Sequence, residues 1–237
     1  MNAKPALASK MKVSIIVPVL NEPAIYEFLS QLRDRAPEAE IIVVRPARSE
    51  NIPASAAKMY DRIVVSDRGR ALQMNAGARA ACGDVFWFVH ADCEVPKDSL
   101  KEIAHTLANP QIVGGCFRIR FARRQLIYRV SDAIGNIGVE WFGRCYGDHG
   151  IFCRRDVFFA VGGFPNLPLF EDAEFYHALK QCGPTRQLKA YVVPSPRRYE
   201  KVGPYRLTAV YALLSALYIF RVPIGVLAKM YGRLCPT

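Results

Sequence analysis

Short apolar runs alternate with helical patterns along the first 110 residues of the chain. Four of these runs have the length and the β-branched and aromatic content of buried strands, and they cover residues 13–19, 41–44, 63–65 and 85–89. After the first run, apolar side chains recur at the spacing of one helix face, at Ile25, Phe28, Leu29 and Leu32. Two further helical patterns follow, at residues 71–82 and 100–107. Strands that alternate with helices predict βαβ units, hence an α/β fold with a mostly parallel sheet flanked by helices.

The pattern changes after Ile112. Residues 116–121 alternate apolar side chains with arginine, which predicts a half-exposed antiparallel strand. A helical stretch covers roughly residues 126–142, and a turn-rich loop at residues 162–168 leads to Glu171-Asp172. Phe175 and Leu179 then give a further helix its apolar face.

The C-terminal part of the chain is strongly apolar. Residues 207–220 form an almost continuous apolar run of fourteen residues, which is short of the roughly 20 that a membrane span needs. Residues 224–231 resume a shorter amphipathic pattern. We expect a flexible tail at residues 1–11, a main domain at 12–204 and a C-terminal helical extension at 205–237. The favoured account packs two helices on the main domain. The alternative rests part of this surface, flanked by Arg206, Arg221, Lys229 and Arg233, on an anionic membrane.

Composition narrows the class of partner. The 237 residues include 32 Lys and Arg against 21 Asp and Glu, a net charge of +11, and 51% are hydrophobic. A core of ordinary size is therefore available, and the cationic excess predicts an anionic partner such as a diphosphate or an acidic membrane surface. Nucleic acid is not expected, because the basic residues are scattered in small groups and no nucleic-acid-binding motif accompanies them.

The cysteines and the N-terminus bear on the compartment. The cysteine count is odd, at seven, and no C-x-x-C pair occurs, so neither a disulfide framework nor a zinc site is indicated. We expect Cys82, Cys116 and Cys153 to be reduced thiols in the core. The apolar run at residues 13–20 is too short for a secretory signal and ends at Asn21-Glu22-Pro23. These features predict a cytoplasmic protein.

Two acidic positions are candidates for a metal-binding or catalytic role. The strand at residues 85–89 stops at His90-Ala91-Asp92, so it presents an imidazole and a carboxylate at the sheet edge where open α/β sheets bind ligands. Glu171-Asp172 stands at the start of a helical pattern. Each has a simpler structural reading, His90-Ala91-Asp92 as a strand-to-loop turn and Asp172 as a helix N-cap. One carboxylate near a metal and a second acting as a base are what sugar transfer from a nucleotide donor requires.

Several segments, taken in order, resemble the family 2 glycosyltransferases. The motifs are residues 15–22 (IIVPVLNE), residues 69–77 (GRALQMNAG), Gly83-Asp84, His90-Ala91-Asp92, Gly147-Asp148-His149, Gly162-Gly163-Phe164, Glu171-Asp172 and Arg197-Arg198-Tyr199. The resemblance runs from about Lys12 to Tyr199 and is closest to small, stand-alone bacterial members. It implies a GT-A fold with a Rossmann-like sheet. It also implies an enzyme that moves a sugar from a nucleotide-sugar donor to an acceptor hydroxyl, with inversion and with a divalent cation, Mn²⁺ or Mg²⁺.

The resemblance also assigns roles to residues. His90-Ala91-Asp92 takes the place of the family's Asp-x-Asp metal motif, so Asp92 is the expected metal ligand and His90 is a weaker candidate that suits Mn²⁺ better than Mg²⁺. Asp172, with Glu171, takes the place of the catalytic base. Donor contacts are expected from Pro18, Asn21, Glu22, Arg45, Arg70, Asn75, Asp92 and Arg198. Arg198 belongs to a basic loop that closes over the donor in related enzymes. The acceptor side is expected at Asp148, His149 and Trp141, and the acceptor itself, which the sequence does not name, is a candidate for a lipid-linked molecule.

One departure from the family pattern leaves the function open. The second strand usually ends in an Asp that holds the nucleoside, but here it ends in Arg45-Pro46-Ala47-Arg48. An arginine cannot accept a hydrogen bond, although it can pair with phosphate. The alternatives are a non-catalytic nucleotide- or sugar-binding protein of the same fold and a sugar-phosphate nucleotidyltransferase. The chain lacks the Gly-rich loop that is usual in sugar-phosphate nucleotidyltransferases. It also lacks the G-x-G-x-x-G motif of a dinucleotide-dependent oxidoreductase.

Overall fold

The structure is a computed structural model that describes residues 11–49 and 51–235. The strands are β1 (Val13–Pro18), β2 (Glu40–Pro46), β3 (Arg62–Ser66), β4 (Val85–Phe88), β5 (Cys93–Glu94), β6 (Gly114–Ile119), β7 (Phe152–Arg154) and β8 (Thr185–Pro194). The helices are α1 (Ile25–Arg35), α2 (Arg70–Ala80), α3 (Ser99–Leu107), α4 (Leu126–Phe142), α5 (Arg155–Ala160), α6 (Glu171–Cys182), α7 (Arg197–Val202), α8 (Pro204–Ile219) and α9 (Ile224–Leu234), with 3₁₀ turns η1 (Ala54–Ala56) and η2 (Gly147–His149). Of the expected N-terminal tail, residues 1–10 lie outside the described residues.

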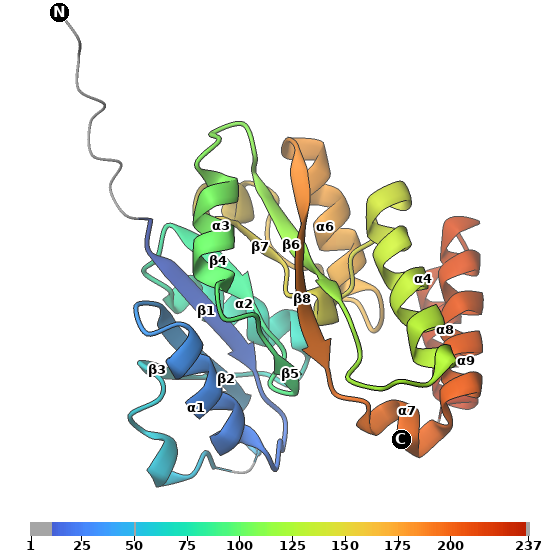
Figure 1. Cartoon of the computed structure of the whole chain (residues 1–237), viewed down its shortest axis with the longest axis horizontal. Coiled ribbons are helices and arrows are strands. Elements are labelled where there is room, and N and C mark those ends of the chain that lie inside the picture. The colour runs from blue at the N-terminus through green and yellow to red at the C-terminus, as the bar shows by residue number, and fades with distance from the viewer. Residues whose placement is uncertain (1–10, 50, 236–237) are drawn as a thin grey trace, which may run out of the picture.

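The strands join in one eight-stranded sheet in the order β3-β2-β1-β4-β7-β6-β8-β5. β1 is parallel to β2 and β4, and β2 is parallel to β3. β7 runs antiparallel to both β4 and β6, and β6 is parallel to β8. The predicted α/β architecture with a mostly parallel sheet flanked by helices is confirmed (Figure 1).

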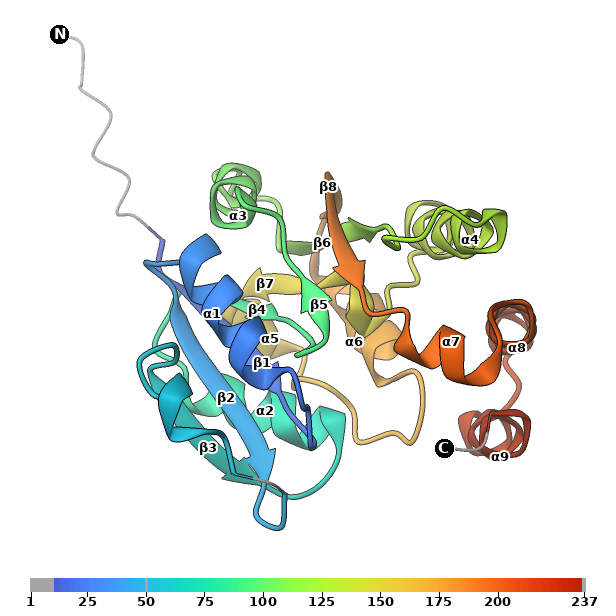
Figure 2. The same cartoon turned by 60° about the horizontal axis from the view of Figure 1, so that its bottom comes forward.

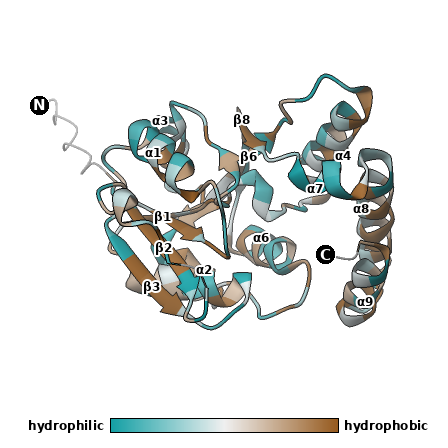
Figure 3. Ribbon diagram, turned by 90° about the horizontal axis from the view of Figure 1, so that it is seen from below, coloured by the Kyte–Doolittle hydropathy of each residue, from teal (hydrophilic) through white to brown (hydrophobic). Residues whose placement is uncertain are grey.

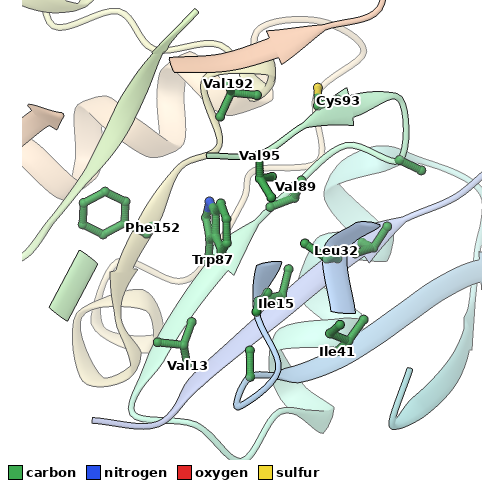
Figure 4. Close-up of a cluster of buried hydrophobic side chains, with 14 of the residues drawn as sticks. Val13, Ile15, Leu32, Ile41, Trp87, Val89, Cys93, Val95, Phe152 and Val192 are labelled. Atoms are coloured by element: carbon green, nitrogen blue, oxygen red, sulfur yellow. The ribbon is translucent and has the colours of Figure 1, made fainter. Parts of the chain in front are cut away.

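Helices cover both faces of this sheet, because successive strand residues point to opposite sides. Ile15 and Ile41 face α1, where they meet Leu32 and Trp87 in one core cluster (Figure 4). Ile16 and its neighbours on the other face pack against α2, α5 and α6. Figure 2 shows α1 and α3 on one side of the strands and α2, α5 and α6 on the other.

Helix α2 lies unusually close to the sheet at Gly77. A Cβ atom there would lie 2.5 Å from Cγ2 of Ile16 and 2.8 Å from Cγ2 of Val44. Two residues earlier, the Asn75 amide donates to the carbonyl of Phe164 at 2.8 Å and accepts from its N–H at 2.9 Å. The segment Asn75-Ala76-Gly77 therefore fixes α2 against the sheet and ties it to the loop at residues 162–164.

The strand expected at residues 116–121 is present as β6 and runs antiparallel to β7, but the expectation that it is half-exposed was wrong. β6 is buried along almost its whole length, because it lies between β7 and β8 and α4 packs beside it. Asn136 of α4 accepts from the N–H of Ile119 at 2.9 Å and donates to its carbonyl at 3.0 Å. One of the two arginines of the alternating pattern, Arg118, extends toward Glu140 of α4, with 3.7 Å between the charged groups.

The C-terminal helices pack on the main domain, as the favoured account expected. Leu207, Leu214 and Leu227 are buried in a cluster with Phe121 and Tyr199. No helix in the described part of the chain is both long and apolar enough to cross a membrane. The outward side of α8 still carries exposed apolar residues, among them Phe220 at its end, and Figure 3 shows hydrophobic residues along this helix. The basic loop expected around Arg198 is a short helix, α7.

Cysteines are found in two environments. All seven lie within the described residues and are free thiols. Cys116 and Cys153 are buried as expected, but the expectation for Cys82 was wrong. Cys82 is exposed because it follows the end of α2, where its sulfur lies 3.3 Å from the Arg62 guanidinium.

Candidate active site

Two adjoining cavities open at the carboxyl ends of β1 and β4. The larger, of about 450 Å³, is lined by the loop after β1, the start of α2, His90-Ala91-Asp92 and α7. The smaller, of about 160 Å³, lies between η2, the start of α6 and helices α4 and α8. We call them the outer and inner cavity. Both are lined by Arg70, Asp148, Phe121, Tyr199, Tyr211 and Tyr231. Asp92 lines only the outer cavity and Asp172 only the inner one.

His90 lies where the two cavities meet. Its Nδ1 is 3.1 Å from the Asp148 carboxylate, and its Nε2 is buried without a hydrogen-bond partner. A Cβ placed on Gly147 would lie 2.4 Å from Nε2, so the ring is packed against the η2 backbone. Burial lowers the pKa of His90, but the hydrogen bond to Asp148 and the negative charges of Asp148 and Asp172 together outweigh it, so the pKa is raised above its ordinary value. The imidazole therefore connects the end of β4 to η2.

Asp172 is a buried carboxylate at the start of α6. Its Oδ2 accepts from the N–H of Gly147 at 2.9 Å, and its Oδ1 is buried without a partner. The N-cap position belongs to Phe170, which has a φ of +63°, so Asp172 is not the N-cap. A left-handed φ at a bulky residue is a strained conformation of the kind that gathers at functional sites.

Burial sets the proton affinity of Asp172. Burial and then repulsion from Glu171 raise the pKa of Asp172 to about 6, although Arg70 and His90 oppose the shift. A helix N-terminus stabilises an anion by only about 0.3–1 kcal/mol, so desolvation exceeds it. A base with this pKa is mostly ionised at neutral pH and is well matched to accept a proton there.

Two ion pairs join residues that line the outer cavity to neighbours outside its lining. Arg70 pairs with Glu171, at 3.2 Å from Nε to the carboxylate. Arg197 pairs with Glu22 at 2.6 Å and lies 3.9 Å from Asp92. Because Arg197 belongs to α7 and Glu22 to the loop after β1, this pair holds α7 against the rim of the cavity. The arrangement presents both cations and carboxylates to an incoming ligand, as a metal-bound diphosphate requires.

Sequence comparison identifies the family. The profile described as "Glycosyl transferase family 2" matches residues 14–165, well over half of the chain. The chain belongs to glycosyl transferase family 2. The enzyme is therefore a glycosyltransferase that uses nucleotide-sugar donors. A search of curated protein sequences gave no match.

Solved structures agree on a GT-A fold. A mannosyltransferase from Pyrobaculum calidifontis, in complex with GDP-Man and Mn²⁺, superposes with a TM-score of 0.64 at 19% identity, covering 97% of this chain and 72% of that one. Glucosyl-3-phosphoglycerate synthase from Mycobacterium tuberculosis, with Mn²⁺, UDP-Glc and phosphoglyceric acid, gives 0.62 at 14% identity over 90% of this chain and 81% of that one. S. aureus TarS, in complex with UDP-GlcNAc, superposes with a TM-score of 0.59 at 20% identity, covering 84% of this chain and 66% of that one.

The glycosyltransferase brings most of the residues expected from its sequence to the two cavities. Around the outer cavity lie Pro18, Glu22, Arg70, His90, Asp92, Asp148 and Arg198. Around the inner cavity lie Arg70, Asp148, His149, Glu171 and Asp172. His149 is fully buried, and its Nδ1 is 2.9 Å from the Phe117 carbonyl, so it forms part of the cavity wall.

Four expected residues line neither cavity. They are Asn21, Arg45, Asn75 and Trp141. Asn75 uses both ends of its amide on the backbone of Phe164. Trp141, expected on the acceptor side, is 77% exposed near the end of α4 and lies outside the lining of the inner cavity. Asn21 belongs to the loop after β1 and has a positive φ of 50°.

Arg45, which replaces the family's Asp, turns back on its own loop. Its guanidinium lies 3.4 Å from the carbonyl of Pro46 and 3.5 Å from that of Ser49. We expect Arg45→Ala to change nucleotide-sugar affinity by less than about threefold, because this group contacts its own turn. Calorimetric titration checks this, with Arg70→Ala as the matched change inside the site. A loss of more than about tenfold for Arg45→Ala would return Arg45 to the donor site.

Other cavity residues were missed by sequence reasoning. Gln73 is buried in α2, and its amide donates to the carbonyls of Val19 and Val44, both at 2.9 Å, which holds the ends of β1 and β2 together beside the outer cavity. A glutamine on the buried face of a helix was the available signal. Tyr211 and Tyr231 reach both cavities from α8 and α9, and nothing local in the sequence indicated that.

Proposed function

We propose that this family 2 glycosyltransferase is inverting and metal-dependent, with the donor in the outer cavity and the acceptor in the inner one. The observation that carries the proposal is the placement of two carboxylates on either side of a shared wall. Asp92 faces the outer cavity and Asp172 the inner one, and Arg70 and Asp148 border both. A donor diphosphate and an acceptor hydroxyl would then meet from opposite sides.

The residues around Asp92 suit a hard divalent cation. Its side chain is 42% exposed, toward the outer cavity. The negative charges of Asp148 and Glu22 act on it, together with the positive charges of His90 and Arg197. Carboxylate and diphosphate oxygens are the ligands that Mn²⁺ and Mg²⁺ accept, and the relatives described above contain Mn²⁺ with GDP-Man or UDP-Glc. A bound cation would neutralise the charge that develops on the leaving diphosphate. His90 fits a ligand role poorly, because its Nδ1 is paired with Asp148 and its Nε2 faces Gly147.

Residues of the chain itself would bind the donor phosphates and accept the acceptor's proton. Arg70 and Arg198 border the outer cavity and supply cations for the donor phosphates. Asp172 accepts the proton of the acceptor hydroxyl as it attacks the sugar carbon, and the Gly147 N–H holds that carboxylate in place. Direct attack from the side opposite the leaving group inverts the anomeric centre.

A donor panel tests the proposal. The full chain is incubated with UDP- and GDP-sugars and Mn²⁺, the released nucleoside diphosphate is measured, and the anomeric configuration of the product is read by NMR. We expect release with at least one donor, loss of release with a chelator, and a product of inverted configuration. Retention of configuration, or release that a chelator does not change, would contradict the proposal.

The pH dependence follows from Asp172. The base must be deprotonated, and burial places its pKa at about 6. Lowering the pH through this value protonates the carboxylate, so kcat/KM is expected to fall about tenfold per pH unit on the acid side and to level off above about pH 7. A rate profile of wild-type enzyme between about pH 5 and 8 checks this. A profile that stays flat down to pH 5 would remove Asp172 from the base role.

The inner cavity favours an acceptor with an apolar part. Its walls include Ile119, Phe121, Ile134, Phe170 and Leu214. Nearby, α4 exposes apolar residues along one face, namely Leu126, Val130, Ile134, Ile137 and Trp141. We propose that this surface and the end of α8 rest on an anionic membrane, where a lipid-linked acceptor would be met.

Vesicle binding tests the membrane contact. The full chain is expected to co-sediment with anionic vesicles at low salt. The double variant Trp141→Glu and Phe220→Glu is expected to lose this co-sedimentation. Both side chains are at least 77% exposed, so the fold is retained. A truncation after Gly203 would instead remove the buried Leu207 and Leu227. If the full chain stays in the supernatant, the membrane contact is excluded.

A further inference from the structure

Two cysteines and a histidine from separate segments meet in the core behind the inner cavity. Cys116 belongs to β6, Cys145 precedes η2, and His149 ends η2. The potential ligand atoms of the three residues lie within 4.8 Å of one another, and all three side chains have no exposed surface. We call these three residues the thiol cluster. It shares no residue with the oxygen-rich surroundings of Asp92.

One polar atom of the thiol cluster, Nε2 of His149, is left without a partner among the described residues. Nδ1 of His149 is 2.9 Å from the Phe117 carbonyl. The other ring nitrogen, Nε2, is buried without a hydrogen-bond partner. An unpaired buried polar atom normally has a cost that its surroundings offset. A histidine with one nitrogen on a backbone carbonyl and a lone pair on the other is the usual form of a metal ligand.

The two thiols are also available as ligands. Cys116 and Cys145 are both free and fully buried. Their sulfurs make long contacts, 3.9 Å from Cys116 Sγ to the Tyr176 hydroxyl and 3.6 Å from Cys145 Sγ to the Tyr146 carbonyl. A thiolate beside an imidazole is the form that binds a borderline or soft metal ion.

We propose that the thiol cluster binds a zinc-class divalent ion through Cys116, Cys145 and His149. Two thiolates and an imidazole leave one position of a tetrahedral ion open. Ligands of one such ion lie about 3.5 to 3.8 Å apart, given metal–ligand lengths of about 2.3 Å to sulfur and about 2.0 Å to nitrogen. The ligand atoms, which lie within 4.8 Å of one another, would need to approach by about 1 Å to bind one ion. His149 lines the inner cavity, which gives the ion a path into the core.

A bound ion would connect β6 to the turn that serves the active site. Asp148 and Gly147 lie beside His149 in η2, and the Gly147 N–H donates to Asp172. The ion would therefore hold η2 in place from behind. It is a positioning site, separate from the donor cation proposed at Asp92, and its existence does not depend on the proposed function.

Cobalt substitution tests the site in the full, reduced chain. Co²⁺ bound by thiolates gives an intense near-ultraviolet charge-transfer band, which oxygen ligands do not produce. We expect this band to saturate at about one Co²⁺ per chain and to disappear when Zn²⁺ is added. Cys116→Ser and Cys145→Ser should lose it, whereas Cys153→Ser should keep it. Cys93→Ser should also keep it, which separates the cluster from the neighbourhood of Asp92.

A second variant avoids any dependence on the stability of the cluster variants. In it the cysteines outside the cluster, Cys82, Cys93, Cys153, Cys182 and Cys235, are replaced by serine. The charge-transfer band should persist in this variant. Zn²⁺, but not Mg²⁺, should raise the melting temperature of the variant. Absence of the band in folded wild-type protein would overturn the proposal. So would a band that survives Cys116→Ser or is lost with Cys93→Ser.

Discussion

Asp172→Asn is expected to reduce sugar transfer by about 10²- to 10⁴-fold, the usual contribution of a positioned general base. The asparagine carbonyl can still accept from the Gly147 N–H, which the carboxylate accepts at 2.9 Å, so the turn at η2 should keep its place. An amide cannot take up the acceptor proton. Donor affinity, measured by titration calorimetry, should stay within about twofold, because Asp172 lines only the inner cavity.

Asp132→Asn is the matched control for this change. Asp132 is a partly buried carboxylate whose pKa burial raises, and it accepts a backbone N–H from Phe121 at 3.0 Å. It lines neither cavity. Transfer by Asp132→Asn should remain near the wild-type rate. An equal loss in both variants would mean that the effect of Asp172→Asn is structural, and it would remove the evidence for a base.

Asp92→Asn is expected to weaken nucleotide-sugar binding in the presence of Mn²⁺ by about tenfold to a hundredfold. Loss of one charged interaction of about 1.5–3 kcal/mol gives a change of this size. Without metal, the variant and the wild type should bind alike, since Asp92 is proposed to contact the donor through the cation. Titrations with and without Mn²⁺ measure both affinities.

Asp98→Asn serves as the control for Asp92→Asn. Asp98 follows in the same segment, is exposed, and pairs only with Lys101 at 3.0 Å among the contacts described. The variant Asp98→Asn should bind the donor as the wild type does, both with and without Mn²⁺. If Asp92→Asn instead bound nucleotide sugar normally in Mn²⁺, the cation would have to be held elsewhere.

Local patterns in the sequence were sufficient for the parallel half of the sheet. The runs at residues 13–19 and 85–89 became β1 and β4, because apolar β-branched runs of that length have few other stable placements. The positions of Asp92 and Asp172 at cavity walls followed from their motifs and from the sheet edge on which such motifs lie. Family membership is now confirmed by the match over residues 14–165.

Features that depend on distant segments were not predictable in this way. The pattern of β6 suggested a half-exposed strand, but its neighbours β7 and β8 and helix α4 bury it. Asn75 belongs to a family motif, yet its amide is used by Phe164, 89 residues away. The thiol cluster joins Cys116 of β6 to Cys145 and His149 of a segment much later in the chain. Burial also outweighed the helix dipole in setting the pKa of Asp172, since desolvation depends on the completed fold.

Asp92 and Asp172 are proposed to serve different ligands, and one calorimetric comparison distinguishes their roles. Asp92→Asn and Asp172→Asn are titrated side by side with the same nucleotide sugar in Mn²⁺. We expect donor affinity to fall by about tenfold or more in Asp92→Asn and to stay near the wild-type value in Asp172→Asn. Equal losses of affinity in the two variants, or a greater loss for Asp172→Asn, would contradict these roles.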